Sequence, residues 1–334
     1  NYRFCTIEPN VGLVDVPDHR MQQLADLIIP NRIVPTQLEI VDIAGLVKGA
    51  SKGEGLGNKF LANIREVSAV IHVIRCFEDE NVLREEGKIN PIGDKDIIET
   101  ELQLKDLDSV DKKIQRCEKM AKTDPKAKVE LEVLQKCKAH LEDGRSIRSL
   151  DLSKEDHAAI ADIFLLTAKP VMYVANVDEA SMHTGNAYSE QLVAMAKQEG
   201  AEVIVMCNNI EAQISEMEDP DDKALFMEEY QMKEPALNRL IQTAYKLLKL
   251  ETYFTAGVQE VRAWTIGSGW KAPQAASVIH TDFEKGFIKA EVIAFDDYIK
   301  FKSEAACRDN GKLRIEGKEY IVKDGDVMHF RFNV

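Results

Sequence analysis

The stretch Leu38-Glu39-Ile40-Val41-Asp42-Ile43-Ala44-Gly45 is the most informative part of this sequence. Its apolar run is typical of a buried strand, and Asp42 and Gly45 follow where that strand ends. A carboxylate in such a place can lie near Mg²⁺, and the backbone N–H of a glycine three residues later can reach a terminal phosphate. Five glycines lie between residues 45 and 57. The stretch therefore favours a phosphate-binding site over an ordinary surface turn.

The bulk composition is that of a soluble globular protein with two or three domains. The chain has 334 residues, of which 45% are hydrophobic and 30% are charged. No apolar run approaches the roughly 20 residues that span a bilayer, and no signal segment opens the chain, so we expect a cytoplasmic protein without membrane contact. Six scattered cysteines without a C-x-x-C pair predict reduced thiols. The net charge of −14 excludes a surface coated in nucleic-acid contacts, but it leaves a local basic surface open.

Four short apolar runs predict a parallel sheet that is buried on both faces. These runs are residues 38–41, 70–74, 171–175 and 203–206. A further short strand is expected at 11–16, and helical spacing is found at 21–28 and 60–67. The pattern indicates a doubly wound α/β domain, whose ligands bind at the carboxyl ends of the strands.

Residues 97–141 carry two apolar stripes at helical spacing and one strong breaker, Asp124-Pro125. They predict two long helices that fold back on each other as an antiparallel hairpin. Residues 105–138 hold ten Lys or Arg against seven Asp or Glu, a local balance of +3. The cations gathered toward the turn are Lys112, Lys113, Arg116, Lys119, Lys122, Lys126 and Lys128. As a set they suit RNA phosphates, although a solvated helical face explains any single lysine equally well.

After Leu250, alternating apolar residues replace the helical spacing. Strands are expected at 258–266, 287–293, 313–315, 320–322 and 327–332. They make a small, mainly β domain of about 80 residues, a common domain size. A helix at 237–249 connects this domain to the α/β part.

The segment Asn176-Val177-Asp178-Glu179 follows the third apolar run. Guanine-reading proteins have Asn-Lys-x-Asp in this place, where the Asp carboxylate accepts from the guanine N1–H and amino group. Val177 and Glu179 replace the Lys and the Asp, which weakens the guanine contact, while the backbone of Val177 can hydrogen-bond an adenine edge. Glu179 still keeps a GTPase of relaxed specificity open. An ordinary strand-to-helix cap is the competing interpretation.

Two features predict slow hydrolysis or none. Leu46 stands where a glutamine would orient the attacking water. The G-x-x-x-x-G-K-[S/T] loop is absent from the sequence, and we expect it to precede Asn1 in the parent protein.

Together these motifs resemble the YchF/Obg-like ATPase family of P-loop NTPases. The segments that carry the resemblance are 1–10, 42–50, 53–58, 176–179, 253–257, 280–283 and 324–327. The resemblance implies a doubly wound P-loop NTPase G-domain over residues 1–84 and 151–249, without its first strand and P-loop. It further implies an inserted coiled-coil hairpin over 85–150 and a C-terminal β-grasp (TGS-like) domain over 250–334. ATP is expected in preference to GTP, with Mg²⁺, slow hydrolysis and a ribosomal partner, the large subunit or its RNA.

The resemblance also implies roles for single residues. Thr6 and Asp42 would be linked to Mg²⁺, and Gly45 would donate its N–H to the γ-phosphate. The residues around the adenine would be Asn176, Val177, Phe77 and Cys207.

This chain departs from the family pattern at several of these places. Arg84 stands where the family commonly has a histidine; an arginine cannot act as a base, but it can stabilise transition-state charge. Arg3 replaces a usual proline, and Asn208 and Asn209 replace small residues beside the expected base pocket, which they could crowd. A non-catalytic RNA-binding scaffold is therefore the alternative function, favoured by Leu46, Arg84 and the absent loop.

Overall fold

The computed structural model describes residues 9–43, 56–80 and 88–333. The chain divides into two compact units: Asn1–Gly12 with Val41–Leu240, and Leu13–Ile40 with Ile241–Val334. The second unit therefore includes an early segment of the chain that we expected in the G-domain. The domain boundaries expected near residues 84, 150 and 249 stay a prediction.

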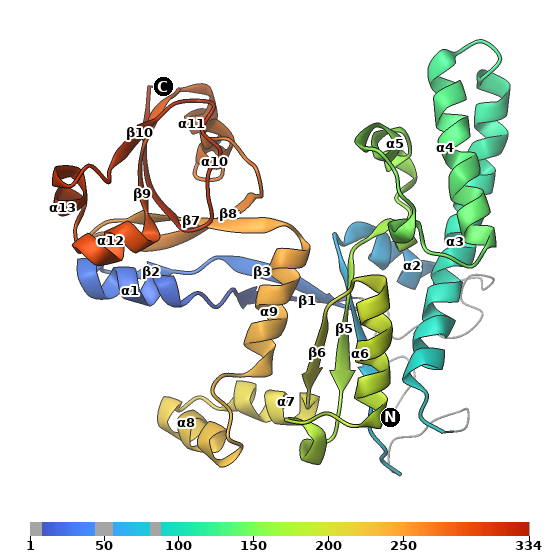
Figure 1. The fold of residues 1–334 in the computed structure, drawn as a ribbon, viewed down its shortest axis with the longest axis horizontal. Helices are drawn as coiled ribbons and strands as arrows, with labels where there is room; N and C mark the ends of the chain where they lie inside the picture. Colours follow the sequence, from blue (N-terminus) through green and yellow to red (C-terminus); the bar gives the residue numbers. More distant parts are fainter. Residues whose placement is uncertain (1–8, 44–55, 81–87, 334) are drawn as a thin grey trace. The chain divides into compact units, whose positions relative to one another are not determined.

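A three-stranded parallel sheet lies at the centre of the first unit (Figure 1), formed by three of the four apolar runs that predict it. Its strands, in spatial order, are β4 (Val70–Arg75), β5 (Val171–Asn176) and β6 (Val203–Met206). Residues 171–175 are buried along their whole length, which explains their unbroken apolar character. The register places Asn176 opposite both Arg75 and Met206, so the carboxyl ends of the three strands meet at one edge.

The helices of the first unit surround this sheet and form the hairpin. They are α2 (Leu56–Glu66), α3 (Pro91–Met120), α4 (Pro125–Glu142), α5 (Lys154–Ala159), α6 (Ala187–Glu199), α7 (Asn208–Glu216) and α8 (Pro220–Glu229). Helix α9 (Ala236–Leu247) begins in this unit and continues into the second.

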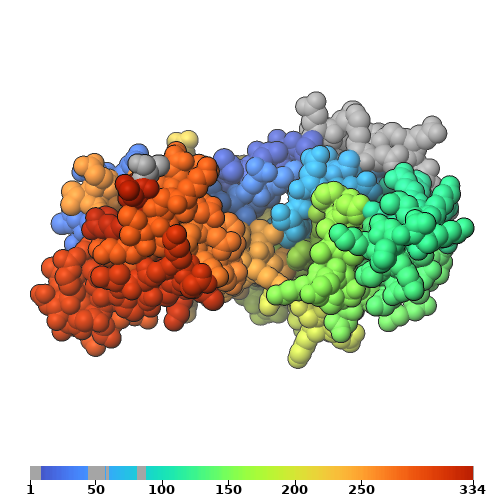
Figure 2. Space-filling model, turned by 90° about the horizontal axis from the view of Figure 1, so that it is seen from above, coloured from blue at the N-terminus to red at the C-terminus, as the bar shows by residue number. Residues whose placement is uncertain are grey.

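The predicted helical hairpin is confirmed: α3 and α4 lie side by side and antiparallel (Figure 1). Each helix begins with a proline after a capping side chain. Asn90 accepts from the Gly93 N–H, and Asp124 accepts from the Lys126 N–H. The two apolar stripes meet in a cluster that includes Val110, Cys117, Val133, Leu134, Cys137 and Leu141. In Figure 2 the hairpin forms one continuous surface, turquoise to green.

A six-stranded mixed sheet forms the second unit, in the order β10-β9-β11-β7-β8-β2. The strands are β2 (Ile33–Val34), β7 (Leu250–Ala256), β8 (Val261–Gly267), β9 (Phe287–Ala294), β10 (Arg314–Glu316) and β11 (Asp326–Phe332). One apolar cluster joins the sheet to α10 (Ala272–Ser277) and α11 (Thr281–Lys285). A second cluster joins it to α1 (His19–Ile28), α12 (Phe295–Phe301) and α13 (Glu304–Asp309). The expected mainly β unit is therefore present.

The strand predicted at 320–322 is wrong. Ile321 makes one isolated bridge to Lys271. The rest of the segment forms backbone hydrogen bonds with the residues at the start of α10. The Ala272 N–H donates to the Tyr320 carbonyl at 2.8 Å, and the Val322 N–H donates to the Trp270 carbonyl at 3.0 Å. Val322 is 1% exposed, so its apolar character reflects burial in a turn rather than a ladder.

Strands β1 (Asn10–Asp15) and β3 (Gln37–Asp42) pair with each other in a separate two-stranded sheet. Both were expected as strands, but the placement of residues 38–41 in the parallel sheet is wrong, because β3 pairs with β1 instead. The five cysteines within the described ranges are free and buried, which agrees with reduced thiols. Among the described residues, no helix combines the length and the apolar character needed to cross a membrane.

Candidate functional site

Asn176 lies where the carboxyl ends of the three parallel strands meet. Its Oδ1 accepts from the Asn208 N–H at 3.1 Å, and its carbonyl accepts from the Cys76 N–H at 2.8 Å. The Asn176 amide therefore ties the start of α7 to the end of β5. Ligands of doubly wound sheets bind at this kind of edge.

Val177 is turned into the protein interior, where its side chain is 2% exposed. Its N–H donates to the Met206 carbonyl at 3.0 Å. We expected the Val177 backbone to hydrogen-bond an adenine edge. This N–H is therefore already used within the protein and is not free to bind a base.

Phe77 follows β4 at the same edge and is partly exposed. The Arg75 guanidinium lies 4.9 Å from the centre of its ring, and Arg75 Nε donates to the Phe77 carbonyl at 3.0 Å. This stacking holds the ring in place and covers part of one face. A base packed on Phe77 would therefore meet a ring that Arg75 has already positioned.

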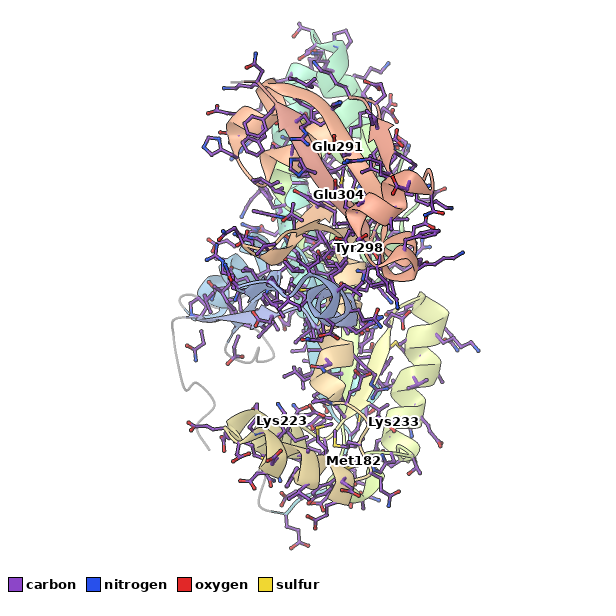
Figure 3. The ribbon with its side chains drawn as sticks, turned by 90° about the vertical axis from the view of Figure 1, so that its left-hand side faces the viewer. Met182, Lys223, Lys233, Glu291, Tyr298 and Glu304 are labelled. Carbon is purple, nitrogen blue, oxygen red and sulfur yellow. The ribbon has the colours of Figure 1, made fainter. Side chains whose placement is uncertain are left out.

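Cys207 is 5% exposed and lies in an apolar cluster with Ile210 and Ile214 of α7. Partly buried side chains pack against this cluster: Met182, Phe226, Met227, Tyr230 and Met232. Figure 3 shows Met182 in the same region as Lys223 and Lys233. The Cys207 side chain therefore packs into the apolar cluster beneath the loop after β6 and does not face solvent.

Glu179 stands where a guanine-reading protein has its aspartate, and its side chain is exposed. A hydrogen bond with Glu179 raises the pKa of the Tyr230 hydroxyl. Tyr230 is itself held in place, because its carbonyl contacts His183 Nε2 at 2.7 Å and its ring lies 4.8 Å from that of Phe226. The Glu179 carboxylate therefore lies near the segment that follows α8 and remains exposed.

Asp42 is exposed at the end of β3 and has no ion pair within the described ranges. The structure describes no group of three or more His, Cys, Asp or Glu that could hold a metal in those ranges. A single carboxylate fits Mg²⁺ held mainly by phosphates and water, because Mg²⁺ commonly takes one or two protein carboxylates beside a nucleotide. Thr6, Gly45 and Arg84 lie outside the described residues.

Two residues of this site carry no recognisable motif. Tyr230 is far from Glu179 in sequence, so pattern analysis gives no reason to connect them. Asn208 could be identified from its place after β6, but the sequence indicates only its size and not its hydrogen bonding.

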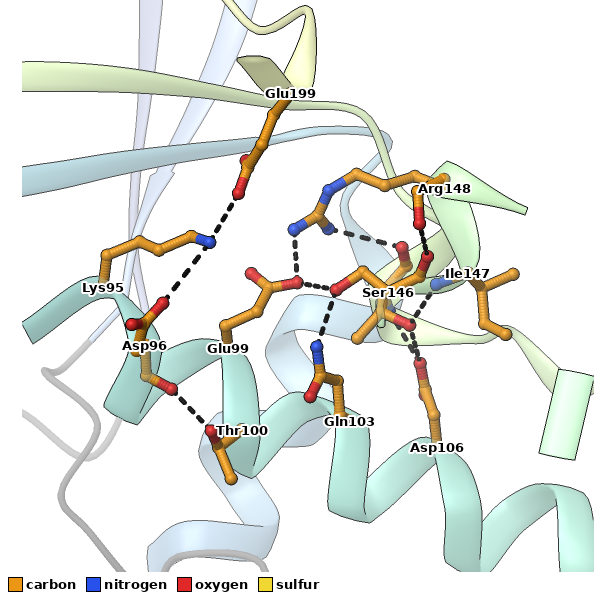
Figure 4. Close-up of polar contacts among 12 residues, drawn as sticks. Lys95, Asp96, Glu99, Thr100, Gln103, Asp106, Ser146, Ile147, Arg148 and Glu199 are labelled. Atoms are coloured by element: carbon orange, nitrogen blue, oxygen red, sulfur yellow. Dashed lines mark hydrogen bonds and ion pairs between the residues drawn. The ribbon is translucent and has the colours of Figure 1, made fainter. Parts of the chain in front are cut away.

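Charged side chains on the first turns of α3 tie the hairpin to the sheet (Figure 4). Lys95 Nζ lies 2.6 Å from Glu199 Oε1, and the Tyr173 hydroxyl donates to Glu199 Oε2 at 2.7 Å. Burial alone would raise the pKa of Glu199, but the hydrogen bonds from Lys95 and Tyr173 outweigh it and lower that pKa. Tyr173 lies three residues before Asn176 on β5, so Glu199 at the end of α6 links the base of the hairpin to the strand that ends at the candidate site.

A second set of contacts holds the chain that follows the hairpin (Figure 4). Glu99 pairs with Arg148 and accepts from the Ser146 hydroxyl. Asp106, which is 1% exposed, accepts from the backbone N–H of Leu166 at 2.8 Å and of Thr167 at 2.7 Å. These contacts fix the segment that leads from α4 to β5.

His72 on β4 gives folding a pH dependence. Burial lowers the pKa of its imidazole to about 4, against an opposing effect of Glu99. An unfolded histidine titrates near 6.5, so the unfolded chain binds more protons below that pH, and stability is lost as pH falls from about 6.5 toward 4. We expect this residue to account for a loss of about 2 kcal/mol in unfolding free energy between pH 7 and pH 5.

Urea unfolding at the two pH values measures this loss. His72→Gln should remove that share of the pH dependence, whereas the same substitution at the exposed His157 should keep it. An identical pH dependence in wild type and His72→Gln would contradict the assignment.

Two family models match the chain. A model described as 50S ribosome-binding GTPase matches residues 1–125. The YchF-GTPase_C model, described as a protein of unknown function, matches residues 250–333.

Curated relatives match along the whole chain. It is 56% identical over 335 residues to the ribosome-binding ATPase YchF of Haemophilus ducreyi, covering 100% of this chain and 92% of that protein. It is 50% identical over 337 residues to the Bacillus subtilis protein of the same name, with the same coverage. A solved structure, described as the Schizosaccharomyces pombe YchF GTPase, matches with a TM-score of 0.87 and 38% identity, over 99% of this chain and 90% of that one. These names disagree on the nucleotide.

Proposed function

The chain belongs to the YchF family, and from this membership we propose a ribosome-associated P-loop NTPase that prefers ATP to GTP and hydrolyses it slowly. The proposed protein acts in the cytoplasm as a conformational switch. ATP orders the loops around Thr6 and Gly45, and hydrolysis releases them.

The surroundings of Glu179 carry the nucleotide preference. A carboxylate selects guanine when it is presented to the N1–H and the amino group of that base. Glu179 raises the pKa of the nearby Tyr230 hydroxyl, which places this carboxylate beside the segment after α8. Adenine has an acceptor at N1, so a withdrawn carboxylate disfavours it less than a presented one would.

The residues proposed around the nucleotide fall into three groups, which contact Mg²⁺, the phosphates and the base. Asp42 and Thr6 assist in holding Mg²⁺, which supplies charge neutralisation to the phosphates when it is bound. Gly45 donates its N–H to the γ-phosphate, and Arg84 stabilises the charge that develops on transfer. Asn176, Phe77, Cys207 and the Val177 carbonyl form the base site. Because Leu46 cannot orient water, the intrinsic rate is low.

The hairpin and the C-terminal unit are the proposed ribosome contacts. The basic tip of the hairpin meets RNA phosphates of the large subunit, and the C-terminal unit, a TGS-like domain over 250–334, adds a second contact. The proposed hairpin domain covers 85–150 and the proposed G-domain covers 1–84 and 151–249, with residues 13–40 packed in the second unit.

Nucleotide titration tests the proposal. In the natural full-length protein, calorimetry with Mg²⁺ should give ATP about tenfold or more tighter binding than GTP, which corresponds to at least about 1.4 kcal/mol. Equal affinities would favour the GTPase of relaxed specificity, for which the exposed position of Glu179 is the supporting observation.

Phosphate release separates the switch from the scaffold. We expect slow release of phosphate from ATP and a faster rate when ribosomes are added. No release above background, with or without ribosomes, would leave the non-catalytic RNA-binding scaffold as the function.

A further inference from the structure

Asn208 holds a buried amide oxygen that has no hydrogen-bond partner. Its Oδ1 is inaccessible to solvent, and no donor reaches it within the part of the chain that the structure describes. Such atoms are rare in native proteins because an unpaired buried acceptor costs free energy. We propose that Asn208 is a specificity-determining residue whose amide accepts a hydrogen bond from the exocyclic amine of adenine. This inference rests on the proposed function and names the residue that selects the base.

The backbone of Asn208 is fixed at the expected base edge. Its N–H donates to Asn176 Oδ1 at 3.1 Å, and Asn176 stands opposite Met206 in the β5–β6 register. The two asparagines therefore stand at the same carboxyl edge of the parallel sheet, where ligands bind. The Asn176 oxygen is used by this contact, whereas the Asn208 oxygen is not.

The chemistry of an amide matches one purine better than the other. An asparagine presents an acceptor and a donor side by side, and adenine presents a donor, its N6 amine, beside the acceptor N7. Guanine presents two acceptors, O6 and N7, on the same edge. The Asn208 oxygen would face the guanine O6 without a proton between them, so this contact favours ATP and penalises GTP.

The competing explanation is that Asn208 only crowds the base pocket, because it is a larger side chain than the small residue that the family usually has there. The two explanations predict opposite effects of truncation. A residue that reads adenine loses a contact when it is shortened, whereas a residue that obstructs the pocket opens space for both nucleotides.

Calorimetric titration of the natural full-length protein with ATP and GTP, each with Mg²⁺, tests the inference. Asn208→Ala should weaken ATP binding by about three- to tenfold and change GTP binding less, so the preference for ATP falls. Asn208→Asp keeps the shape but replaces the donor with an oxygen, so it should also weaken ATP. Gln213→Ala, at an exposed position of the same helix, is the matched control and should bind ATP as the wild type does.

Each other outcome has a definite meaning. If wild type prefers ATP and Asn208→Ala keeps both its affinity and its preference, the role of Asn208 is overturned while the proposed function stands. Tighter binding of both nucleotides by Asn208→Ala overturns it in favour of crowding. Wild type that prefers neither nucleotide, or binds neither, overturns the proposed preference and this inference together.

Discussion

Glutamine substitutions at Arg116, Lys119 and Lys122 should weaken ribosome binding by roughly tenfold for each phosphate contact that is lost. The logarithm of the affinity should also depend less steeply on the logarithm of salt concentration, by about 0.7–0.9 for each lost contact. Co-sedimentation with ribosomes over a series of salt concentrations measures both effects.

The structure decides which hairpin cations can make such contacts. Lys112 lies 2.8 Å from Asp108, Lys113 contacts Glu130 and Asp162, and Lys138 lies 2.7 Å from Asp111. These three charges are already compensated. The exposed cations without an ion pair in the described ranges are Arg116, Lys119, Lys122, Lys126, Lys128 and Lys136.

The paired lysines provide a matched control. Glutamine at Lys112, Lys113 and Lys138 changes the net charge of the same two helices by the same amount. We expect this control to retain most of the affinity and the salt dependence. Equal losses in the two triple variants would mean that the hairpin acts through its overall charge, and no loss in either would mean that the lysines form a solvated face.

Regular periodicity explains why most of the fold can be predicted from the sequence. The β5 run is continuously apolar because both faces of that strand are buried, and the hairpin stripes repeat because one helix covers the other. The prediction failed at Tyr320-Ile321-Val322, because a turn with one buried side chain there has the same apolar pattern as a short strand. It also gave no indication that residues 13–40 join the C-terminal unit, because that depends on contacts distant in sequence.

The site is less predictable because its chemistry depends on which groups are already paired. Sequence position identified Asn176 and Val177, but only the structure reveals that the Val177 N–H is used by Met206. The same holds for the compensated Lys113 and for the unpaired oxygen of Asn208. A motif gives the residue type at a position, whereas hydrogen bonding across strands determines what that residue can still bind.

Replacing Asp106 with alanine should cost roughly 3–5 kcal/mol of unfolding free energy, the largest stability effect that we expect in this chain. The carboxylate accepts from two backbone N–H groups and from the Thr167 hydroxyl, each at 2.7–2.8 Å. Thr167 is fully buried and Leu166 is 1% exposed, so water cannot replace the lost acceptor. Urea unfolding at neutral pH measures the change.

Asp106→Asn distinguishes the cost of a buried charge from the value of its acceptors. Burial raises the pKa of Asp106, although the hydrogen bonds from Thr167 and Leu166 oppose that shift. If the buried charge were the dominant cost, the neutral asparagine would stabilise the protein. We expect destabilisation instead, because an asparagine must direct one N–H toward a donor when three donors converge on the site.

Asp111→Ala is the control on the same helix, because Asp111 pairs with the surface residue Lys138 and should change stability little. The position of Asp106 gives the expected loss a specific location. Asp106 joins α3 to residues 166–168, which lie just before β5. Removing its carboxylate should therefore speed amide hydrogen exchange first in residues 166–168 and in the part of α3 around Asp106. Uniform acceleration across the first unit, or stability equal to that of Asp111→Ala, would mean that Asp106 does not anchor the hairpin to the sheet.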